Sequence, residues 1–445
     1  MSARQCAQRL LSAIVDRRTP MDALTDDQHG HPTYLALEAR DRSLVRAILM
    51  AALRYRGDLE AMIDGFVSRP LPAGAHSLRA ILHVAGAQIL LLDIPAHSAV
   101  DLAVECANRD PRNRKFAALV NAVTRRMVKE KDNLLSAIES QPNNAPDWFH
   151  AQLSAIYGDV EANEIARLHR YPAPLDITLK NPSDPVAGDL LDVAEGLRIG
   201  DRTVRLTGKI DVTALPGFPE GQWWVQDFAA SLPAKLFGDL NGKRVLDLCA
   251  APGGKTAQML AMGAQVTALE KSASRARRLR ENLERIGFAE RCRVVVGDLF
   301  TFEPEVAFDA VLLDAPCSST GTVRRHPDVP WTKTAADIAK LADLQARMLA
   351  RAADFVAPSG QLVFSNCSLM PEEGEQVAAD FIVAHGDRFS LEPVVAGELS
   401  LDGLGITDAM VGAAGMVRTT PAHQAHENVA LAGMDGFFAA SFRKR

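Results

Sequence analysis

The sequence predicts three parts: an all-α amino-terminal domain, a small α+β domain, and a carboxy-terminal α/β domain with a Rossmann-like sheet. Apolar residues recur at helical spacing through residues 1–135, where strand signals are scarce. From about residue 240, short apolar strands alternate with helical stretches, as in an open parallel sheet. The expected boundaries are 1–137 for the helical domain, 138–164 for a linker, 165–235 for the α+β domain and 236–445 for the α/β domain.

The helical pattern is clearest in SLVRAILMAALRY and LRAILHVAGAQILLL, where apolar side chains share one helix face. A polar stretch around Gln141, Pro142 and Asn143 then breaks the pattern, as a linker does. In the α+β domain, LDITLKN and RTVRLTG are expected to be strands. The adjacent Trp223 and Trp224 fit either base stacking or packing within a strand, and the sequence leaves them unassigned.

Polar residues end the predicted strands of the α/β domain. The strands VLDL, VTALE, RVVVGD, FDAVLLD and QLVFSN end at or near Asp247, Glu270, Asp298, Asp314 and Asn366. Ligands of open parallel sheets bind beyond the carboxyl ends of the strands. These polar side chains therefore predict a ligand site at that edge of the sheet.

The loop VLDLCAAPGGKT, at 245–256, predicts a cofactor site where a strand turns into a helix. Its end resembles a phosphate loop, but the first glycine of that motif would fall at Cys249. The dinucleotide fingerprint is absent as well, while Glu270 closes the next strand about twenty residues later, where a ribose diol is held. A nucleoside cofactor without a pyrophosphate fits best.

Composition indicates a cytoplasmic protein. The chain has 445 residues, of which 47% are hydrophobic, and no apolar run approaches the roughly 18 residues that span a membrane. The amino terminus lacks a cleavage-like end and is expected to be an amphipathic helix. Six scattered cysteines form no CxxC pairs and have no His partners at zinc spacing, which argues against disulfides and against a metal site. We expect a monomer.

The net charge of −6 is unevenly distributed. Residues 1–140 hold 19 Lys and Arg against 16 Asp and Glu, whereas residues 141–445 hold 30 against 39. Cations cluster in the amino-terminal part, where they indicate either a solvated helix face or contacts to nucleic-acid phosphates. The candidate phosphate contacts are Arg40, Arg42, Arg46, Arg112, Arg114, Lys115, Arg125 and Arg126, with Arg324 and Arg325 in the later segment RRHP.

Four motifs occur in a recognisable order: CAAPGGKT, DAPCS, RRHPD followed by Trp331, and NCS. From about residue 165 the chain resembles the RNA (cytosine-C5)-methyltransferases that use S-adenosylmethionine (AdoMet). The first 135 residues resemble the NusB-like helical domain of one bacterial branch, the RsmB or Sun type. The resemblance implies that 5-methylcytosine is formed in 16S ribosomal RNA. The alternatives are the same chemistry on transfer RNA or 23S ribosomal RNA, and a non-catalytic RNA-binding or assembly factor.

The resemblance also assigns catalytic roles. It implies that Cys367 is the nucleophile, that Cys317 assists release, and that Asp314 and Lys255 contact the base. Cytosine C5 is a poor nucleophile, and a thiolate that adds at C6 turns the ring into an enamine that accepts a methyl group. Asp314 would stabilise the charge that develops on the ring.

The cofactor residues follow from the same resemblance. The implied AdoMet contacts are Cys249, Ala250, Ala251, Pro252, Gly253, Gly254, Lys255, Glu270, Arg275, Asp298 and Asp314. Within this set the loop would line the methionine part, Glu270 the ribose and Asp298 the adenine. Two positions depart from the family pattern: Glu270 stands where aspartate is common, and Asn366 stands where threonine usually precedes the nucleophile.

Overall fold

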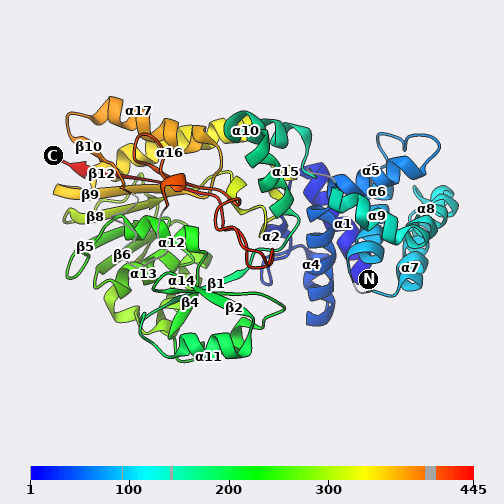
Figure 1. Ribbon diagram of the computed structural model, residues 1–445, viewed down its shortest axis with the longest axis horizontal. Coiled ribbons are helices and arrows are strands. Elements are labelled where there is room, and N and C mark those ends of the chain that lie inside the picture. The colour runs from blue at the N-terminus through cyan, green and yellow to red at the C-terminus, as the bar shows by residue number, and fades with distance from the viewer. Residues whose placement is uncertain (1, 93, 141–143, 396–406) are drawn as a thin grey trace. The chain divides into compact units, whose positions relative to one another are not determined.

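The computed structural model describes residues 2–92, 94–140, 144–395 and 407–445 (Figure 1). Its contacts form two compact units. The first comprises Met1–Arg170 with Val323–Thr334, and the second comprises Tyr171–Thr322 with Ala335–Arg445. The segment 323–334, which contains RRHPD and Trp331, thus packs with the amino-terminal unit although it follows the Cys317 loop in the chain.

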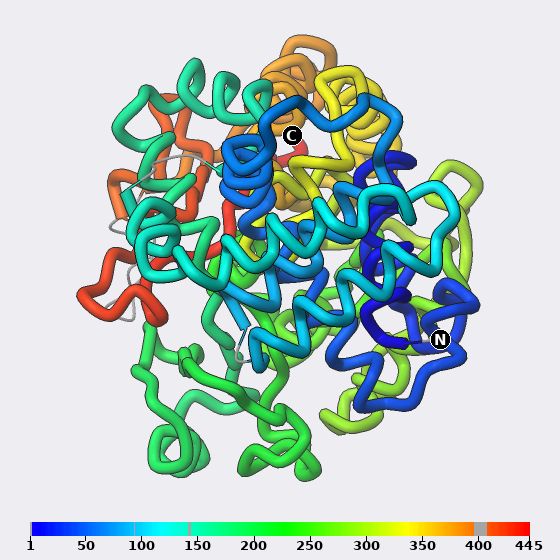
Figure 2. Tube along the Cα trace, turned by 90° about the vertical axis from the view of Figure 1, so that its right-hand side faces the viewer, coloured from blue at the N-terminus to red at the C-terminus, as the bar shows by residue number. Residues whose placement is uncertain are grey.

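The first unit is helical throughout its described residues, as Figure 2 shows for the blue and cyan part of the chain. Its α-helices are α1 (Ala3–Arg17), α2 (Met21–Leu24), α3 (Pro32–Leu35), α4 (Ala39–Arg54), α5 (Arg56–Phe66), α6 (His76–Gly86), α7 (Ala96–Arg109), α8 (Ala117–Lys129), α9 (Lys131–Ser140), α10 (Asp147–His169) and α15 (Val329–Thr332). Helix α1 begins at a capping box between Ser2 and Gln5 and buries Leu10, Leu11 and Ile14. The all-α prediction is confirmed. None of the described helices combines the length and apolar character needed to cross a membrane.

The expected linker at 138–164 differs from the structure. Helix α10 occupies most of it, with a kink at Gly158, where φ is 76°. Phe149 and Leu153 are buried because apolar spacing resumes directly after Pro146. The linker residues Gln141, Pro142 and Asn143 lie outside the described residues.

Buried polar contacts hold the segment 323–334 within the helical unit. The carboxylate of Asp328 accepts a hydrogen bond from the backbone N–H of Met21 at 2.9 Å. The buried guanidinium of Arg54 donates to the carbonyl oxygens of Arg324 at 2.8 Å and His169 at 3.0 Å. Both carbonyl oxygens thus gain a charged donor, and the segment becomes part of the core of this unit.

The second unit contains a small antiparallel sheet with strand order β2-β3-β1-β4. Its elements are β1 (Leu175–Leu179), α11 (Val186–Val193), β2 (Gly196–Ile199), β3 (Thr203–Leu206) and β4 (Trp223–Val225). Trp223 is fully buried and Trp224 is 4% exposed. The indole N–H of Trp223 donates to the carbonyl of Pro216 at 2.7 Å, so packing is the role that the structure gives to this tryptophan.

The main sheet of this unit has eight strands, seven of them in the order β10-β12-β9-β8-β5-β6-β7, with β11 paired to β12. They are β5 (Arg244–Leu248), β6 (Gln265–Glu270), β7 (Cys292–Val296), β8 (Phe308–Asp314), β9 (Val356–Asn366), β10 (Phe389–Glu392), β11 (Val417–Thr419) and β12 (Phe437–Lys444). The five strands from β9 to β7 are parallel, as predicted. Strands β10, β11 and β12 pair antiparallel, so the expectation of a wholly parallel sheet is wrong. Helix α17 connects β9 to β10, and β12 lies between these two strands and runs antiparallel to both.

Helices cover both faces of the main sheet (Figure 1). These helices are α12 (Phe228–Lys235), α13 (Gly254–Ala261), α14 (Ala273–Ile286), α16 (Ala335–Asp354) and α17 (Glu375–His385). In β8, Val311 and Leu313 pack with α16 and α17, whereas Ala310 and Leu312 pack with α12, α13 and α14. The alternation follows from the two-residue period of a strand and leaves the strand ends free to carry the site.

One buried ion pair fixes the small sheet. Asp176 and Arg205 are 0% and 1% exposed, and their side chains form two hydrogen bonds of 2.7 and 2.8 Å. Arg205 also donates to the carbonyl of Leu431 at 2.9 Å, and Asp176 accepts from the backbone N–H of Phe228 at 3.0 Å. The pair thereby joins β1 and β3 to two distant parts of the same unit.

We predict that Arg205→Met lowers the free energy of unfolding of the second unit by about 3–5 kcal/mol, because it leaves the Asp176 carboxylate buried without its partner. Urea unfolding followed by tryptophan fluorescence measures the change. Lys209→Met, which removes an exposed cation from the same region, is the control and leaves stability nearly unchanged. Equal stabilities of the two variants would contradict the assignment.

Candidate active site

The carboxyl ends of neighbouring strands bring the predicted catalytic residues together. Strands β8 and β9 are parallel neighbours, and Asp314 at the end of β8 lies opposite Ser365 in β9. The backbone N–H of Ala315 donates to the carbonyl of Ser365 at 2.8 Å, which extends the pairing into the Cys317 loop. The loops that carry Cys317 and Cys367 therefore leave the sheet side by side.

The two thiols touch. The sulfur atoms of Cys317 and Cys367 lie 3.4 Å apart, and both residues are half-buried. The hydrogen bond from the Cys317 thiol, together with Ser319 and the Lys255 ammonium, lowers the pKa of Cys367. The same hydrogen bond, burial and the nearby Glu373 carboxylate raise the pKa of Cys317. The arrangement thus favours Cys367 as the thiolate and Cys317 as the protonated partner.

Lys255 and Asp314 form an ion pair beside the thiols. The ammonium of Lys255, on α13, lies 2.8 Å from Asp314 Oδ2, and the hydroxyl of Ser365 donates to Asp314 Oδ1 at 3.0 Å. Lys255 also lies over the ring of Phe437, 4.8 Å from its centroid. The structure therefore brings all four predicted catalytic residues to one edge of the sheet. Their roles stay predictions.

The loop from Cys249 to Gly254 has the close turn that a cofactor loop needs. Gly253 has φ of 107°, and a Cβ atom there would lie 2.4 Å from Leu279 Cδ1, so only glycine fits. Helix α13 begins directly at Gly254. Its first backbone N–H groups thus face the strand ends, where they can bind a polar ligand.

Glu270 offers a buried acceptor at the same edge. It is 3% exposed, and its Oε1 accepts the backbone N–H of Ser272 at 2.9 Å. Its Oε2 lies 3.3 Å from the guanidinium of Arg275 but has no hydrogen bond of good geometry. A buried oxygen in this state is suited to accept a hydrogen bond from a hydroxyl group. The residues therefore fit the ribose of the expected AdoMet.

Asp298 follows β7, the neighbour of β6. Its carboxylate lies 2.8 Å from the Lys271 ammonium, and this contact lowers the pKa of Asp298. Arg275, at the start of α14, donates to the carbonyl of Ala251 at 2.6 Å and so ties the cofactor loop to that helix. The predicted cofactor residues therefore line adjacent strand ends, from β5 to β7.

Two other cysteines are not suited to act as thiolates. Burial raises the pKa of Cys249 and of Cys292 to about 12, so both remain protonated thiols at neutral pH. Within the described part of the chain, no group of His, Cys, Asp and Glu side chains is placed to hold a metal ion.

A buried carboxylate behind the thiols was not predicted. Glu373 is fully buried and binds Ser318 and Ser368, the residues that follow the two cysteines. The segment MPEEGE holds three glutamates, and its sequence gives no sign that the middle one is buried. Asn366, where the family usually has threonine, donates to the carbonyl of Glu373 at 2.6 Å and accepts from the Ser368 N–H at 3.0 Å. This asparagine therefore closes the Cys367 turn.

Two of the predicted RNA contacts on α4 also have structural partners. Arg42 donates to the carbonyls of Leu35 and Leu37 at 2.9 Å, and Arg46 donates to the carbonyl of Thr25 at 2.7 Å. Arg40 is exposed at the start of the helix. The hydrogen bonds to these carbonyls give Arg42 and Arg46 a role in stabilising the neighbouring loop. The phosphate contacts proposed for all three arginines stay predictions.

A second group of cations, which lie just before α8 and near its end, is exposed. The members are Arg112, Arg114, Lys115, Arg125 and Arg126. Arg112 pairs with Asp110 at 3.0 Å and Arg126 with Glu130 at 2.8 Å, while Lys115 has a ring contact with Phe116. This surface is available to an anionic partner.

Arg324 differs from its expected place. It is 1% exposed, because its segment packs within the helical unit, and a buried guanidinium is not presented to a surface phosphate. Arg325 in the same segment is partly exposed. No pattern in the sequence indicates that this segment joins the helical unit.

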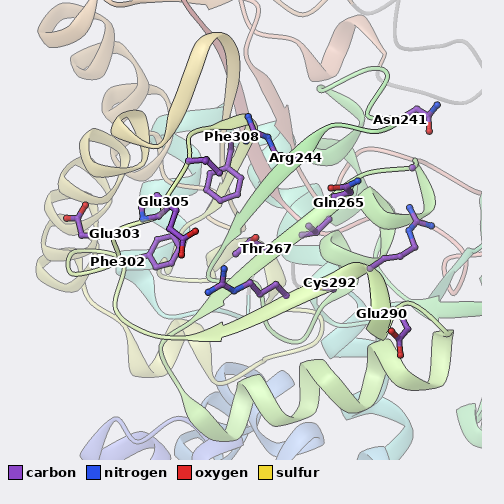
Figure 3. A pocket seen from close by; sticks show the side chains of 16 residues that line it. Asn241, Arg244, Gln265, Thr267, Glu290, Cys292, Phe302, Glu303, Glu305 and Phe308 are labelled. Atoms are coloured by element: carbon purple, nitrogen blue, oxygen red, sulfur yellow. The ribbon is translucent and has the colours of Figure 1, made fainter.

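A hollow of about 900 Å³ lies at the opposite end of the main sheet. Figure 3 shows it with Arg244, Gln265, Cys292 and Phe308, which are the first residues of four strands. The thiols and the cofactor loop lie at the carboxyl ends of the strands. This hollow is therefore separate from the candidate site.

Comparisons with known proteins agree with both units. A family model described as 16S rRNA methyltransferase RsmB/F matches residues 235–443, and the NusB family model matches residues 1–129. Ribosomal RNA small subunit methyltransferase B of Pasteurella multocida is 33% identical over 413 residues, which cover 88% of this chain and 90% of that protein. The protein of the same name from Xanthomonas campestris pv. campestris is 35% identical over 402 residues, with coverage of 87% and 89%. The solved structure of a methyltransferase homolog protein from Pyrococcus horikoshii is 26% identical with a TM-score of 0.51, and covers 66% of this chain and 94% of that one.

We predict that the contribution of Asp247 to the stability of the second unit falls as pH rises from about 4 to about 7, because burial raises the pKa of Asp247 to about 7. The neutral acid is favoured in the folded state, so its contribution is complete below the unfolded pKa and is lost as pH passes the folded value. A shift of this size contributes on the order of 4 kcal/mol. Asp247→Asn should flatten this part of the profile of unfolding free energy against pH. An unchanged slope in the variant would contradict the prediction.

Proposed function

Because the chain belongs to the RsmB/F family of 16S rRNA methyltransferases, we propose that it forms 5-methylcytosine in small-subunit ribosomal RNA, with AdoMet as its cofactor. The observation that carries this proposal is the contact between Cys317 and Cys367, 3.4 Å apart at the ends of adjacent parallel strands. An AdoMet-dependent enzyme that methylates a nitrogen or a hydroxyl has no need of two thiols and an ion pair at this edge.

The first step assigns Cys367 as the nucleophile. Its lowered pKa favours the thiolate, which adds to cytosine C6 and moves the ring electrons towards C5. Asp314 and Lys255 contact the N3 and amino edge of the base: the Lys255 ammonium stabilises the negative charge that develops there, and the Asp314 carboxylate accepts a hydrogen bond from the amino group. The residues that hold AdoMet are the loop Cys249–Lys255, with Glu270 at the ribose, and the cofactor supplies the electrophilic methyl group.

The second step assigns Cys317 as the base. After the methyl group is joined to C5, the C5 proton passes to Cys317 and the bond between Cys367 and C6 breaks, which returns the thiolate. Two of the causes that raise the pKa of Cys317 are its hydrogen bond to Cys367 and the charge of Cys367. Both causes are lost when Cys367 is bonded to C6, so Cys317 releases its thiol proton to solvent at that stage, and the resulting thiolate takes the C5 proton.

The helical unit is proposed to bind the RNA backbone. The exposed cations around α8, from Arg112 to Arg126, are suited to phosphate contacts that add affinity without sequence information. No observation favours transfer RNA or 23S ribosomal RNA as the substrate. The paired thiols argue against a purely non-catalytic assembly factor.

Cys317→Ala is predicted to accumulate a covalent protein–RNA adduct, because methyl transfer proceeds but the C5 proton is not removed. Denaturing gel electrophoresis with labelled RNA and AdoMet measures the adduct. Cys367→Ala is the control that forms none. Absence of an adduct with Cys317→Ala, where the unaltered protein methylates RNA, would remove the proposed division of roles.

Lys115→Gln is predicted to weaken RNA binding and to reduce the slope of log Kd against log salt concentration by about one. Lys340→Gln removes an exposed cation from α16 of the other unit and serves as the matched control. Fluorescence anisotropy at several salt concentrations separates the two. An equal slope in both variants would mean that the α8 surface does not contact phosphates.

A further inference from the structure

Glu373 lies at the centre of a buried polar cluster behind the two thiols. It belongs to the short turn Pro371–Glu373, six residues after Cys367, and is 0% exposed. Four donors reach its carboxylate: the N–H of Ser318 at 2.8 Å, the side-chain amide of Gln345 at 3.1 Å, the hydroxyl of Ser368 at 2.5 Å and the hydroxyl of Ser318. An ionised carboxylate only accepts hydrogen bonds, and this surrounding of four donors suits that state.

The donors come from both thiol-bearing loops. Ser318 follows Cys317 directly, and Ser368 follows Cys367 directly. Gln345, on α16, also donates to the carbonyl of Pro316 at 2.9 Å. The peptide groups on both sides of Cys317 are therefore held through Glu373 and Gln345.

Thr320 adds a second link between the loops. Its hydroxyl oxygen lies 3.1 Å from the Ser368 hydroxyl and accepts the N–H of Leu369 at 2.9 Å. The cluster thus ties the two loops to each other over several residues, whereas the sheet pairing holds only the strands before them. A shift of one loop would break hydrogen bonds to a buried charge, which is costly.

The charge of Glu373 also distinguishes the two thiols. The Glu373 carboxylate contributes to the raised pKa of Cys317. The Lys255 ammonium lowers the pKa of Cys367 and so favours its thiolate. The Asp314 carboxylate also acts on Cys367 and opposes its ionisation. Glu373 and Lys255 therefore favour opposite protonation states in the two thiols.

The geometry points to Glu373 as a positioning residue for both thiols: its buried carboxylate holds the Cys317 and Cys367 loops to one point and fixes the distance between the two sulfur atoms. The assignment rests on the proposed function for its catalytic meaning. Its structural part, the control of thiol geometry and charge, holds without any RNA.

The test compares Glu373→Gln with Glu372→Gln, which replaces the neighbouring exposed glutamate by the same residue. Alkylation of each cysteine by iodoacetamide is followed by mass spectrometry between pH 6 and 10 on the full chain, and RNA methylation is measured in parallel. In Glu373→Gln we expect Cys317 to react about tenfold faster at pH 8, because the carboxylate that disfavours its thiolate is gone. We expect kcat to fall about tenfold or more while the affinity for AdoMet is retained, because the two sulfur atoms are no longer held at a fixed distance from each other.

Ser368→Ala separates the tether from the charge and serves if Glu373→Gln fails to fold. It removes one hydrogen bond and keeps the carboxylate, so kcat should fall about threefold while the pH profile of Cys317 is unchanged. Equal alkylation profiles and equal kcat values in Glu373→Gln and Glu372→Gln would overturn the assignment. A kcat of Ser368→Ala equal to that of the wild-type protein would overturn it as well. Failure of the wild-type protein to methylate RNA would overturn the proposed function alone, because the alkylation result stands without RNA.

Discussion

Strand β8 pairs in parallel with β9, with Asp314 opposite Ser365, and the positions of the reacting groups depend on this register. A shift by one residue would turn Asp314 to the other face and separate it from the Ser365 hydroxyl, 3.0 Å away. The same pairing starts the two thiol loops from adjacent points. Lys255 then reaches Asp314 because β5, the strand before its helix, is the other neighbour of β8. Three neighbouring strands thus suffice to assemble the four catalytic candidates.

Charge is distributed across this edge in a way that suits two thiols with different tasks. The Lys255 ammonium and the Cys317 hydrogen bond stabilise a thiolate at Cys367, whereas Glu373 disfavours a second anion at Cys317. Asp247 is buried behind the cofactor loop, and burial raises its pKa to about 7. Its carboxyl group is therefore mostly neutral below that pH. The Cys367 thiolate is therefore the negative charge at this edge that the reaction neutralises. Formation of a bond to Cys367 removes that charge and allows Cys317 to ionise next.

Much of this site could be predicted from local sequence, because strands buried on both faces form continuous apolar runs that end at polar residues. Strands β6 and β8 lie at or within one residue of their expected ends. The antiparallel return of β12 was not predictable, because an apolar strand carries no mark of its direction. The burial of Glu373 depends on Ser318, 55 residues away, and so on tertiary contacts alone. The inclusion of residues 323–334 in the helical unit has the same cause.

The measurement that bears most directly on the proposed chemistry is AdoMet-dependent release of tritium from RNA that carries 5-tritiated cytosine. Small-subunit ribosomal RNA, large-subunit ribosomal RNA and transfer RNA are compared, each with the unaltered protein and with Cys367→Ala. The two-thiol mechanism predicts release from small-subunit RNA alone, and none with Cys367→Ala. Release that persists in Cys367→Ala, or methylation of small-subunit RNA without tritium release, would contradict attack at C6 and transfer to C5.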